Sequence, residues 1–225
     1  MANSNNSFLV QRILERYTET LGGPRSVAAL SSLSIEGSQV QGGTSYQFLM
    51  RKKRPNSIRY RLTAGETSIV CGFNGGQGWQ RTKVGGAVTI EDLSTDQLSA
   101  LRDEADFDSP LFRHLEKSWH QISLFGNEHL GDTYVNVLEV SKFRKPFVRY
   151  YLDSVSGLVI KRVQIHPDGT YGLETQYRDY REIEGYQFAF EVENRVGDQL
   201  VSLVRIETIE VNPGLLSFYF EKPRN

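Results

Sequence analysis

Cysteine is almost absent from this chain, because Cys71 is the only one among 225 residues. A single cysteine excludes a disulfide within the chain. Cys71 lies among Ile69, Val70 and Phe73, and this setting predicts a small, buried hydrophobic side chain. One cysteine of this kind leaves the redox compartment of the protein open.

Long hydrophobic runs are also missing. A helix that spans a bilayer needs about 20 consecutive apolar residues, and the sequence contains no such segment. The first residues do not show the basic segment and apolar core of a secretory signal peptide. Two interpretations therefore stay open, a cytosolic protein or the mature form of an exported one.

Neither sign of charge is in excess. The chain has 26 lysines and arginines, 27 aspartates and glutamates, and a formal net charge of −1. This balance provides no global field that would gather nucleic acid or an anionic membrane. The one basic run, residues 51–54, is interpreted as a solvated strand end before Pro55, with a docking patch for a membrane or a partner as the alternative.

Patterns of catalytic and metal-binding residues are missing as well. No His-x-x-x-His or Cys-x-x-Cys pattern occurs. The acidic residues between 103 and 108 lack the glycine and the final glutamate of a calcium loop, and no Gly-x-Ser-x-Gly elbow is present. We therefore predict no catalytic residues, no metal site and no cofactor.

What the sequence does contain is alternation of apolar and polar residues, which is typical of strands because successive side chains point to opposite faces. Val148, Tyr150 and Leu152, for example, would share one face. Asn74-Gly75 predicts a tight hairpin with a type I′ turn. Short strands are predicted at residues 34–40, 46–51, 58–62, 68–73, 78–82, 148–153, 158–165, 177–181, 187–193 and from 201 onward.

Helical segments interrupt these strands. Apolar residues recur at helical spacing between Phe8 and Leu21, before Gly22-Gly23. Pro24 suits the start of a short second helix. A capping box beginning at Ser94 predicts a helix that carries Leu98 and Leu101, and Ser109-Pro110 predicts the start of another that carries Leu111, Phe112 and Leu115.

No linker or repeat divides the chain. All-β barrels of roughly 200–250 residues are often one domain. We therefore predict a single domain over residues 1–225, with the polar residues 1–6 disordered.

Several motifs follow one another in a recognisable order. The N-terminal helix ends in Leu21-Gly22-Gly23, a basic strand leads to Pro55, and Phe73-Asn74-Gly75 precedes Gly78-Trp79. Further along come residues 101–107 before Ser109-Pro110-Leu111, then Gly126 and Gly131, Tyr150-Tyr151-Leu152-Asp153 with Gly157-Leu158, Asp179-Tyr180-Arg181, and Phe220-x-x-Pro223. Over nearly the whole chain, this order resembles that of the LolA-like periplasmic carriers of lipoproteins and the related outer-membrane lipoprotein-sorting proteins.

The resemblance implies a mainly β fold, a curved and incomplete antiparallel barrel with an N-terminal helix and short lid helices. It also implies a non-catalytic carrier that holds the acyl chains of a lipoprotein or a lipid in an apolar cavity and moves them across the periplasm. Its partners would be the acylated protein or lipid and membrane-associated donor and acceptor proteins, with no nucleic acid. Unlike the membrane-anchored receptors of this group, the chain has no N-terminal cysteine that could be lipidated.

The candidates to line such a cavity are large apolar residues of the first strands and of the lid helices. They are Phe48, Met50, Tyr60, Leu62, Phe73 and Trp79 from the strands, with Leu98, Leu101, Phe107, Leu111, Phe112 and Leu115 from the lid. Each could equally be an ordinary core residue. Two other functions stay open: an interaction scaffold without lipid, and an enzyme for a hydrophobic substrate in which His114 or His120 meets a carboxylate.

Overall fold

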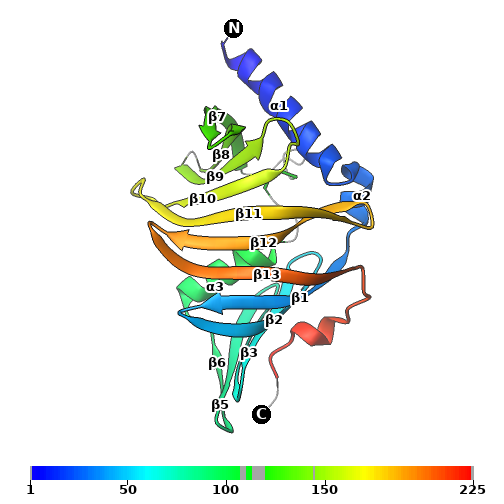
Figure 1. Cartoon of the computed structure of the whole chain (residues 1–225), viewed down its shortest axis with the longest axis vertical. Helices are drawn as coiled ribbons and strands as arrows, with labels where there is room; N and C mark the ends of the chain where they lie inside the picture. The colour runs from blue at the N-terminus through cyan, green and yellow to red at the C-terminus, as the bar shows by residue number, and fades with distance from the viewer. Residues whose placement is uncertain (1, 107–109, 113–119, 144, 224–225) are drawn as a thin grey trace. The chain divides into compact units, whose positions relative to one another are not determined.

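The computed structural model describes residues 2–106, 110–112, 120–143 and 145–223. Figure 1 shows the elements in chain order. The helices are α1 (Ala2–Thr20), α2 (Gly23–Ala29), α3 (Thr95–Ala105) and the 3₁₀ helix η2 (Ser217–Phe220). The strands are β1 (Ser32–Gln41), β2 (Thr44–Lys53), β3 (Ser57–Ala64), β4 (Thr67–Asn74), β5 (Gln77–Val84), β6 (Ala87–Asp92), β7 (His120–Leu130), β8 (Thr133–Lys142), β9 (Lys145–Asp153), β10 (Val159–Ile165), β11 (Tyr171–Ile183), β12 (Tyr186–Val196) and β13 (Gln199–Val211).

The described strands form one antiparallel sheet. Its order is β6-β5-β4-β3-β2-β1-β13-β12-β11-β10-β9-β8-β7. Consecutive strands are therefore neighbours almost throughout, as hairpin connections require, and only β13 pairs with a strand distant in sequence, β1. The two end strands, β6 and β7, do not pair with each other, so the sheet is not closed. The predicted mainly β, incompletely closed antiparallel fold is confirmed.

The chain forms two compact units, each built from two segments. Unit 1 contains Met1–Ala28 and Asp108–Leu203, and unit 2 contains Ala29–Phe107 and Val204–Asn225. Both units are thus assembled from segments that are far apart in the chain. That residues 1–225 act as one domain stays a prediction.

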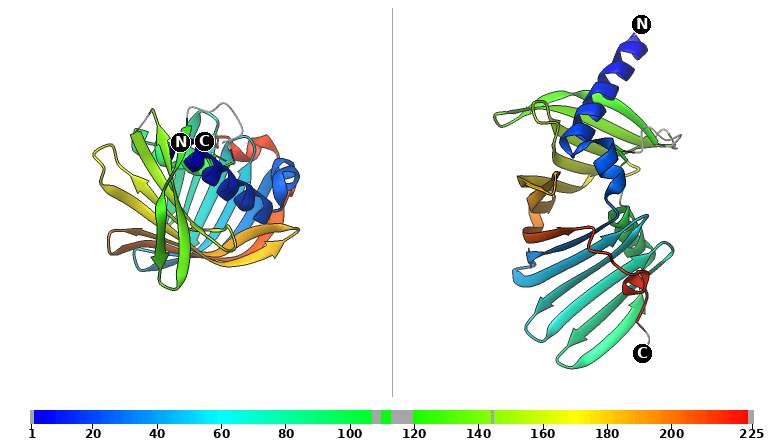
Figure 2. Two further views of the ribbon diagram at one scale, coloured as in Figure 1. Left: turned by 90° about the horizontal axis from the view of Figure 1, so that it is seen from above. Right: turned by 90° about the vertical axis from the view of Figure 1, so that its right-hand side faces the viewer.

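In unit 1, α1 packs on the strands β7 to β10 (Figure 2). Val10, Leu14 and Tyr17 share one side of the helix, because they are four and three residues apart, and all three are buried. They contact a sheet face formed by Leu138, Val140, Val148, Tyr150, Leu152 and Val159. The helix begins at Ala2, inside the stretch for which the sequence predicts disorder.

In unit 2, α3 and η2 lie on opposite faces of the strands β3 and β4. Ile58 and Phe73, which pair across these strands, pack with α3. The next residues on the same strands, Arg59 and Gly72, contact Tyr219 and Trp79 on the η2 side. Figure 2 shows η2, in red, beside these strands. Strand alternation therefore gives the unit two faces that differ in chemistry.

The strands predicted from sequence are all present. All of them are longer than predicted except β10, which begins one residue later, and β6, β7 and β8 were not predicted. β8 has no clean alternation because both of its faces are covered: Val135 and Val137 pack in one cluster, and Leu138 and Val140 pack in another. β6 ends the sheet, and Ala87 and its next two neighbours are all exposed.

Two local predictions need correction. Pro110, Leu111 and Phe112 form a turn and not the start of a helix, and residues 113–119 lie outside the described part of the chain. The hairpin after β4 is present, but its loop is Gly75-Gly76 and only Gly75 has a positive φ, of 68°. A type I′ turn needs positive φ at both central residues, so the turn is of another type.

Candidate functional site

Helix α3 begins at a complete capping box. The side chain of Ser94 accepts a hydrogen bond from the backbone N–H of Gln97, and the Gln97 side chain accepts one from the backbone N–H of Ser94. These bonds satisfy two donors that would otherwise be unpaired at the helix start. Leu98, Leu101 and Ala105 then recur at three- and four-residue spacing and turn the same side of the helix to the sheet.

The surface beneath α3 is apolar and is assembled from β2, β3 and β4. We call it the α3 face. Met50 on β2 pairs with Tyr60 on β3, and Tyr60 pairs with Cys71 on β4. Because these residues stand directly opposite one another, their side chains share one face of the sheet. The strand residues of the α3 face are Met50, Ile58, Tyr60, Ile69, Cys71 and Phe73.

A glycine sets how closely α3 approaches. A Cβ atom at Gly78 would lie 2.6 Å from Cδ1 of Leu98 and 2.9 Å from Cδ1 of Leu93. A larger residue at this position would force the Leu98 and Leu93 side chains to shift from their places against β5. The close approach also explains how an 11-residue helix stays on the sheet, since so short a helix is marginal without tertiary packing.

The ionisable groups of the α3 face are neutral at physiological pH. Burial raises the pKa of the Tyr60 hydroxyl, and the neighbouring Cys71 raises it further. Burial also raises the pKa of the Cys71 thiol, which is 2% exposed and donates to the Gln80 side chain. The prediction that Cys71 is a small buried residue is confirmed. A neutral, apolar face suits an apolar ligand.

Trp79 lies on the other face of the sheet. It is 1% exposed, its ring rests on the backbone of Gly72, and its Nε1 donates to the carbonyl of Phe220, 3.1 Å away. The Arg59 guanidinium lies 5.6 Å from the centre of its ring. Trp79 therefore anchors the C-terminal segment on β4 and β5 and does not join the α3 face.

Apart from Trp79, the predicted cavity residues divide into four groups. Met50, Tyr60, Phe73, Leu98 and Leu101 come together in the α3 cluster. Phe48 pairs with the buried Leu62 on the same face, two residues along the strands from Met50 and Tyr60. Leu111 and Phe112 belong to the core of unit 1, where Phe112 stacks on Tyr17 with ring centres 5.0 Å apart. Phe107 and Leu115 lie outside the described residues.

Sequence reasoning missed several members of the α3 face. Ile58 is completely buried, and Ala105 is too. Ile58 could have been found, because it stands two residues before Tyr60 and must share its face. Ala105 gave no signal of its own, since alanine is common on any side of a helix.

The structure offers no cation site in the part of the chain that it describes, because no three His, Cys, Asp or Glu side chains come together there. Nor does any described helix combine the length and the apolar character that crossing a bilayer would require.

Comparisons with known proteins place this geometry in a structural group. No family model matches the chain, and no curated protein sequence matches it. Among the solved structures that match, three do so over almost the full length of both chains. A DUF1329 family protein from Desulfovibrio piger has a TM-score of 0.65 at 10% identity, covering 94% of this chain and 97% of that one.

The other two structures carry the names that the motif order suggests. A LolA superfamily protein from Nitrosomonas europaea has a TM-score of 0.63 at 15% identity, covering 95% of this chain and 97% of that one. A domain from Vibrio parahaemolyticus named for outer-membrane lipoprotein sorting has a TM-score of 0.65 at 11% identity, with the same coverage. At these identities the likeness concerns the fold, and the chain has the LolA-like fold that its motif order predicted.

Proposed function

We propose that the protein is a non-catalytic carrier that holds acyl chains, of a lipid-modified protein or of a lipid, against the α3 face of unit 2. The observation that carries the proposal is an apolar sheet face, bordered by Lys52, that one short amphipathic helix covers. The fold shared with lipoprotein-sorting and LolA superfamily proteins supports it. In this proposal the carrier works in the periplasm, between a donor and an acceptor at the two membranes.

The energies favour an exchange between α3 and a bound chain. Leu98 and Leu101 are the large side chains that α3 places on the face, and each contributes roughly 1.5–3 kcal/mol when buried. An acyl chain gains roughly 0.8 kcal/mol for each buried CH₂, on the order of 10 kcal/mol for a long chain before ordering costs. A chain can therefore replace α3 on the sheet.

One ion pair links α3 to the sheet. Lys52 on β2 and Glu104 on α3 lie 4.0 Å apart, and the Lys52 side chain is 15% exposed and the Glu104 side chain 49%. Because water screens the Glu104 end, this pair contributes on the order of 1 kcal/mol. The outward side of the helix, which includes Ser99 and Arg102, is exposed. In this proposal, opening would cost this pair together with the apolar contacts that the cargo then replaces.

Native mass spectrometry of the purified protein, followed by lipid extraction, tests this proposal. We expect acyl-chain species in stoichiometric amounts, or uptake of a fluorescent fatty acyl probe by an empty preparation. Met50→Lys should abolish binding, because it places a charge on the sheet face that the chain would occupy. Ser99→Lys adds the same charge on the exposed side of α3 and should bind like the wild type.

Folding of each variant is checked by thermal unfolding. Leu98→Lys provides a second test, because it weakens the packing of α3 without charging the sheet and should therefore bind at least as well as the wild type. A wild-type protein that carries no lipid and takes up no probe would refute the carrier and favour an interaction scaffold with a filled core. Equal binding by Met50→Lys and Ser99→Lys would show that a chain binds elsewhere.

A further inference from the structure

The second face of unit 2 concentrates positive charge. Arg51 on β2 stands directly opposite Arg59 on β3. Arg61 lies two residues further along β3, and Val70 stands between it and Arg81 on β5. Side chains two residues apart on a strand share a face, so all four guanidinium groups rise from the same side of the sheet. We call this side the arginine face. Like charges directly opposite each other destabilise a sheet.

The arginines of this face lack ion-pair partners in the part of the chain that the structure describes. None of the ion pairs between described residues involves these four arginines. Glu36 on β1, which stands opposite Leu49, lies on the same side of the sheet but pairs with none of them. Asp92 on β6 also lies on this side and is paired with Lys222 at 2.8 Å. No described carboxylate therefore forms an ion pair with the cluster.

The pKa of Arg59 is lowered by its surroundings. Burial lowers the pKa of its guanidinium, and the charges of Arg51, Arg61 and Arg81 lower it further, while Tyr219 acts in the opposite direction. No aspartate or glutamate is among the main causes of this pKa shift. The shift has the sign expected when cations are gathered without counter-charges.

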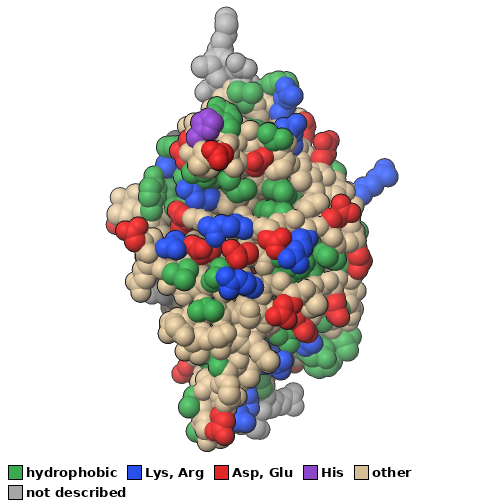
Figure 3. Space-filling view, in the orientation of Figure 1, with side chains coloured by type: hydrophobic (Ala, Val, Ile, Leu, Met, Phe, Trp, Pro, Cys, Tyr) green, Lys and Arg blue, Asp and Glu red, His purple; other side chains and the backbone are tan. Residues whose placement is uncertain are grey.

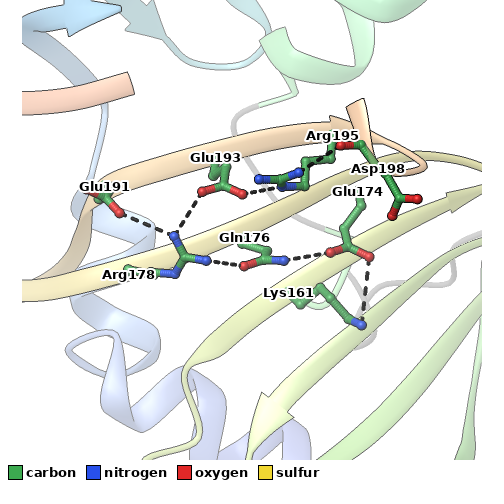
Figure 4. A network of polar contacts seen from close by, with 8 residues as sticks. All are labelled: Lys161, Glu174, Gln176, Arg178, Glu191, Glu193, Arg195 and Asp198. Carbon is green, nitrogen blue, oxygen red and sulfur yellow. Dashed lines mark hydrogen bonds and ion pairs between the residues drawn. The ribbon is translucent and has the colours of Figure 1, made fainter. Parts of the chain in front are cut away.

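In unit 1, several cationic side chains on the strands are paired with acidic ones. Arg178 contacts Glu191 and Glu193, and Lys161 contacts Glu174, across neighbouring strands (Figure 4). Figure 3 shows positive and negative side chains interspersed over this region of the surface. The arginines of the arginine face have no such acidic partners among the described residues, so a general need for charged residues on exposed strands does not explain why they gather there.

A pocket lies on the arginine face. Its volume is about 250 Å³. Nε of Arg51 is buried there and has no hydrogen-bond partner among the described residues. The Arg51 guanidinium lies 5.1 Å from the centre of the Tyr219 ring, and Nη1 of Arg59 donates to the Tyr219 carbonyl at 2.9 Å. The lining residues are Leu49, Arg51, Arg59, Tyr60, Arg61 and Tyr219.

We propose that this pocket binds a phosphate group, carried by a small soluble phosphate or by a phospholipid headgroup. Each guanidinium group can donate two parallel hydrogen bonds to the oxygens of a phosphate, whereas a lysine ammonium acts as a point charge. Several arginines can therefore surround one phosphate group. The pocket is below the roughly 300–1,000 Å³ of sites for drug-sized ligands, so it suits a phosphate group rather than a larger molecule. The proposal does not rest on acyl-chain carriage, because the α3 face lies on the other side of the same strands.

Calorimetry with inorganic phosphate and glycerol 3-phosphate, at constant ionic strength set with sodium chloride, tests the soluble arm. We expect saturable binding by the wild type. Arg51→Gln/Arg61→Gln should weaken it by about tenfold or more for each lost charge-assisted contact. This variant leaves Arg59 in place, so η2 keeps its hydrogen bond. Arg61→Gln alone replaces an exposed side chain and serves if the double variant does not fold.

Arg178→Gln is the matched control, since it removes a strand arginine that has acidic partners, and it should bind phosphate like the wild type. Co-sedimentation with phosphatidylglycerol vesicles, with phosphatidylcholine vesicles for comparison, tests the headgroup arm. Vesicle binding that glycerol 3-phosphate displaces and Arg61→Gln weakens identifies a headgroup as the source, whereas calorimetric binding alone identifies a soluble phosphate. Absence of both, or equal loss in Arg178→Gln, overturns the proposal.

Discussion

Gly72→Ala should destabilise unit 2 although it adds only one methyl group. A Cβ atom at this position would lie 2.5 Å from Cε2 and Cζ2 of the Trp79 ring. Carbon atoms do not approach this closely, and Trp79 is held in place by its bond to the Phe220 carbonyl. The indole must therefore move away from β4.

The cost follows from what Trp79 loses. Exposing about 100 Å² of the ring costs roughly 2.5 kcal/mol. Loss of the bond from Nε1 adds about 1 kcal/mol, and a smaller displacement that keeps the ring buried costs about 1–3 kcal/mol as overpacking. We expect a loss of about 2–4 kcal/mol, which lowers Tm by about 5–15 °C for a chain of this size.

Urea unfolding and differential scanning calorimetry measure the effect. Gly76→Ala is the matched control, because a Cβ atom at Gly76 would meet nothing within 4 Å and the φ of this residue is not positive. It should change stability by less than about 1 kcal/mol. Equal stability of Gly72→Ala and Gly76→Ala would refute the argument that Trp79 rests on the bare backbone of Gly72.

Three further perturbations probe other parts of the structure. Burial raises the pKa of Tyr60 in the folded state, so the stability that Tyr60 contributes is present below the unfolded pKa of about 10 and is lost as the pH rises above that value. Tyr60→Phe should therefore flatten the alkaline decline of the unfolding free energy, measured by urea unfolding between pH 8 and 11. An unchanged slope would contradict this prediction. Leu14→Ala in α1 should cost about 2–5 kcal/mol, whereas Leu9→Ala, at a side chain that is 41% exposed, should cost much less by chemical denaturation. Ser94→Ala should cost about 1 kcal/mol and speed hydrogen exchange in α3, with similar exchange in both proteins arguing against the capping box.

The two faces of unit 2 explain why the basic run was interpreted incompletely from sequence. Residues 51–54 read as one solvated strand end, but their side chains alternate between faces. Arg51 joins the arginine face, whereas Lys52 contacts Glu104 of α3 on the opposite side. Charge that looks continuous along the chain is thus divided by the pleat of the strand.

The sequence by itself determined the local elements: strands from alternation, turns from glycine, and the start of α3 from the capping box at Ser94. These elements depend largely on neighbours within a few residues. Only tertiary structure decided that Trp79 faces η2, that Leu111 joins the core of unit 1, and that Arg51 meets Arg59. Each of these depends on pairing register or on packing between distant segments, and a shift of one residue in register would move every side chain to the other face.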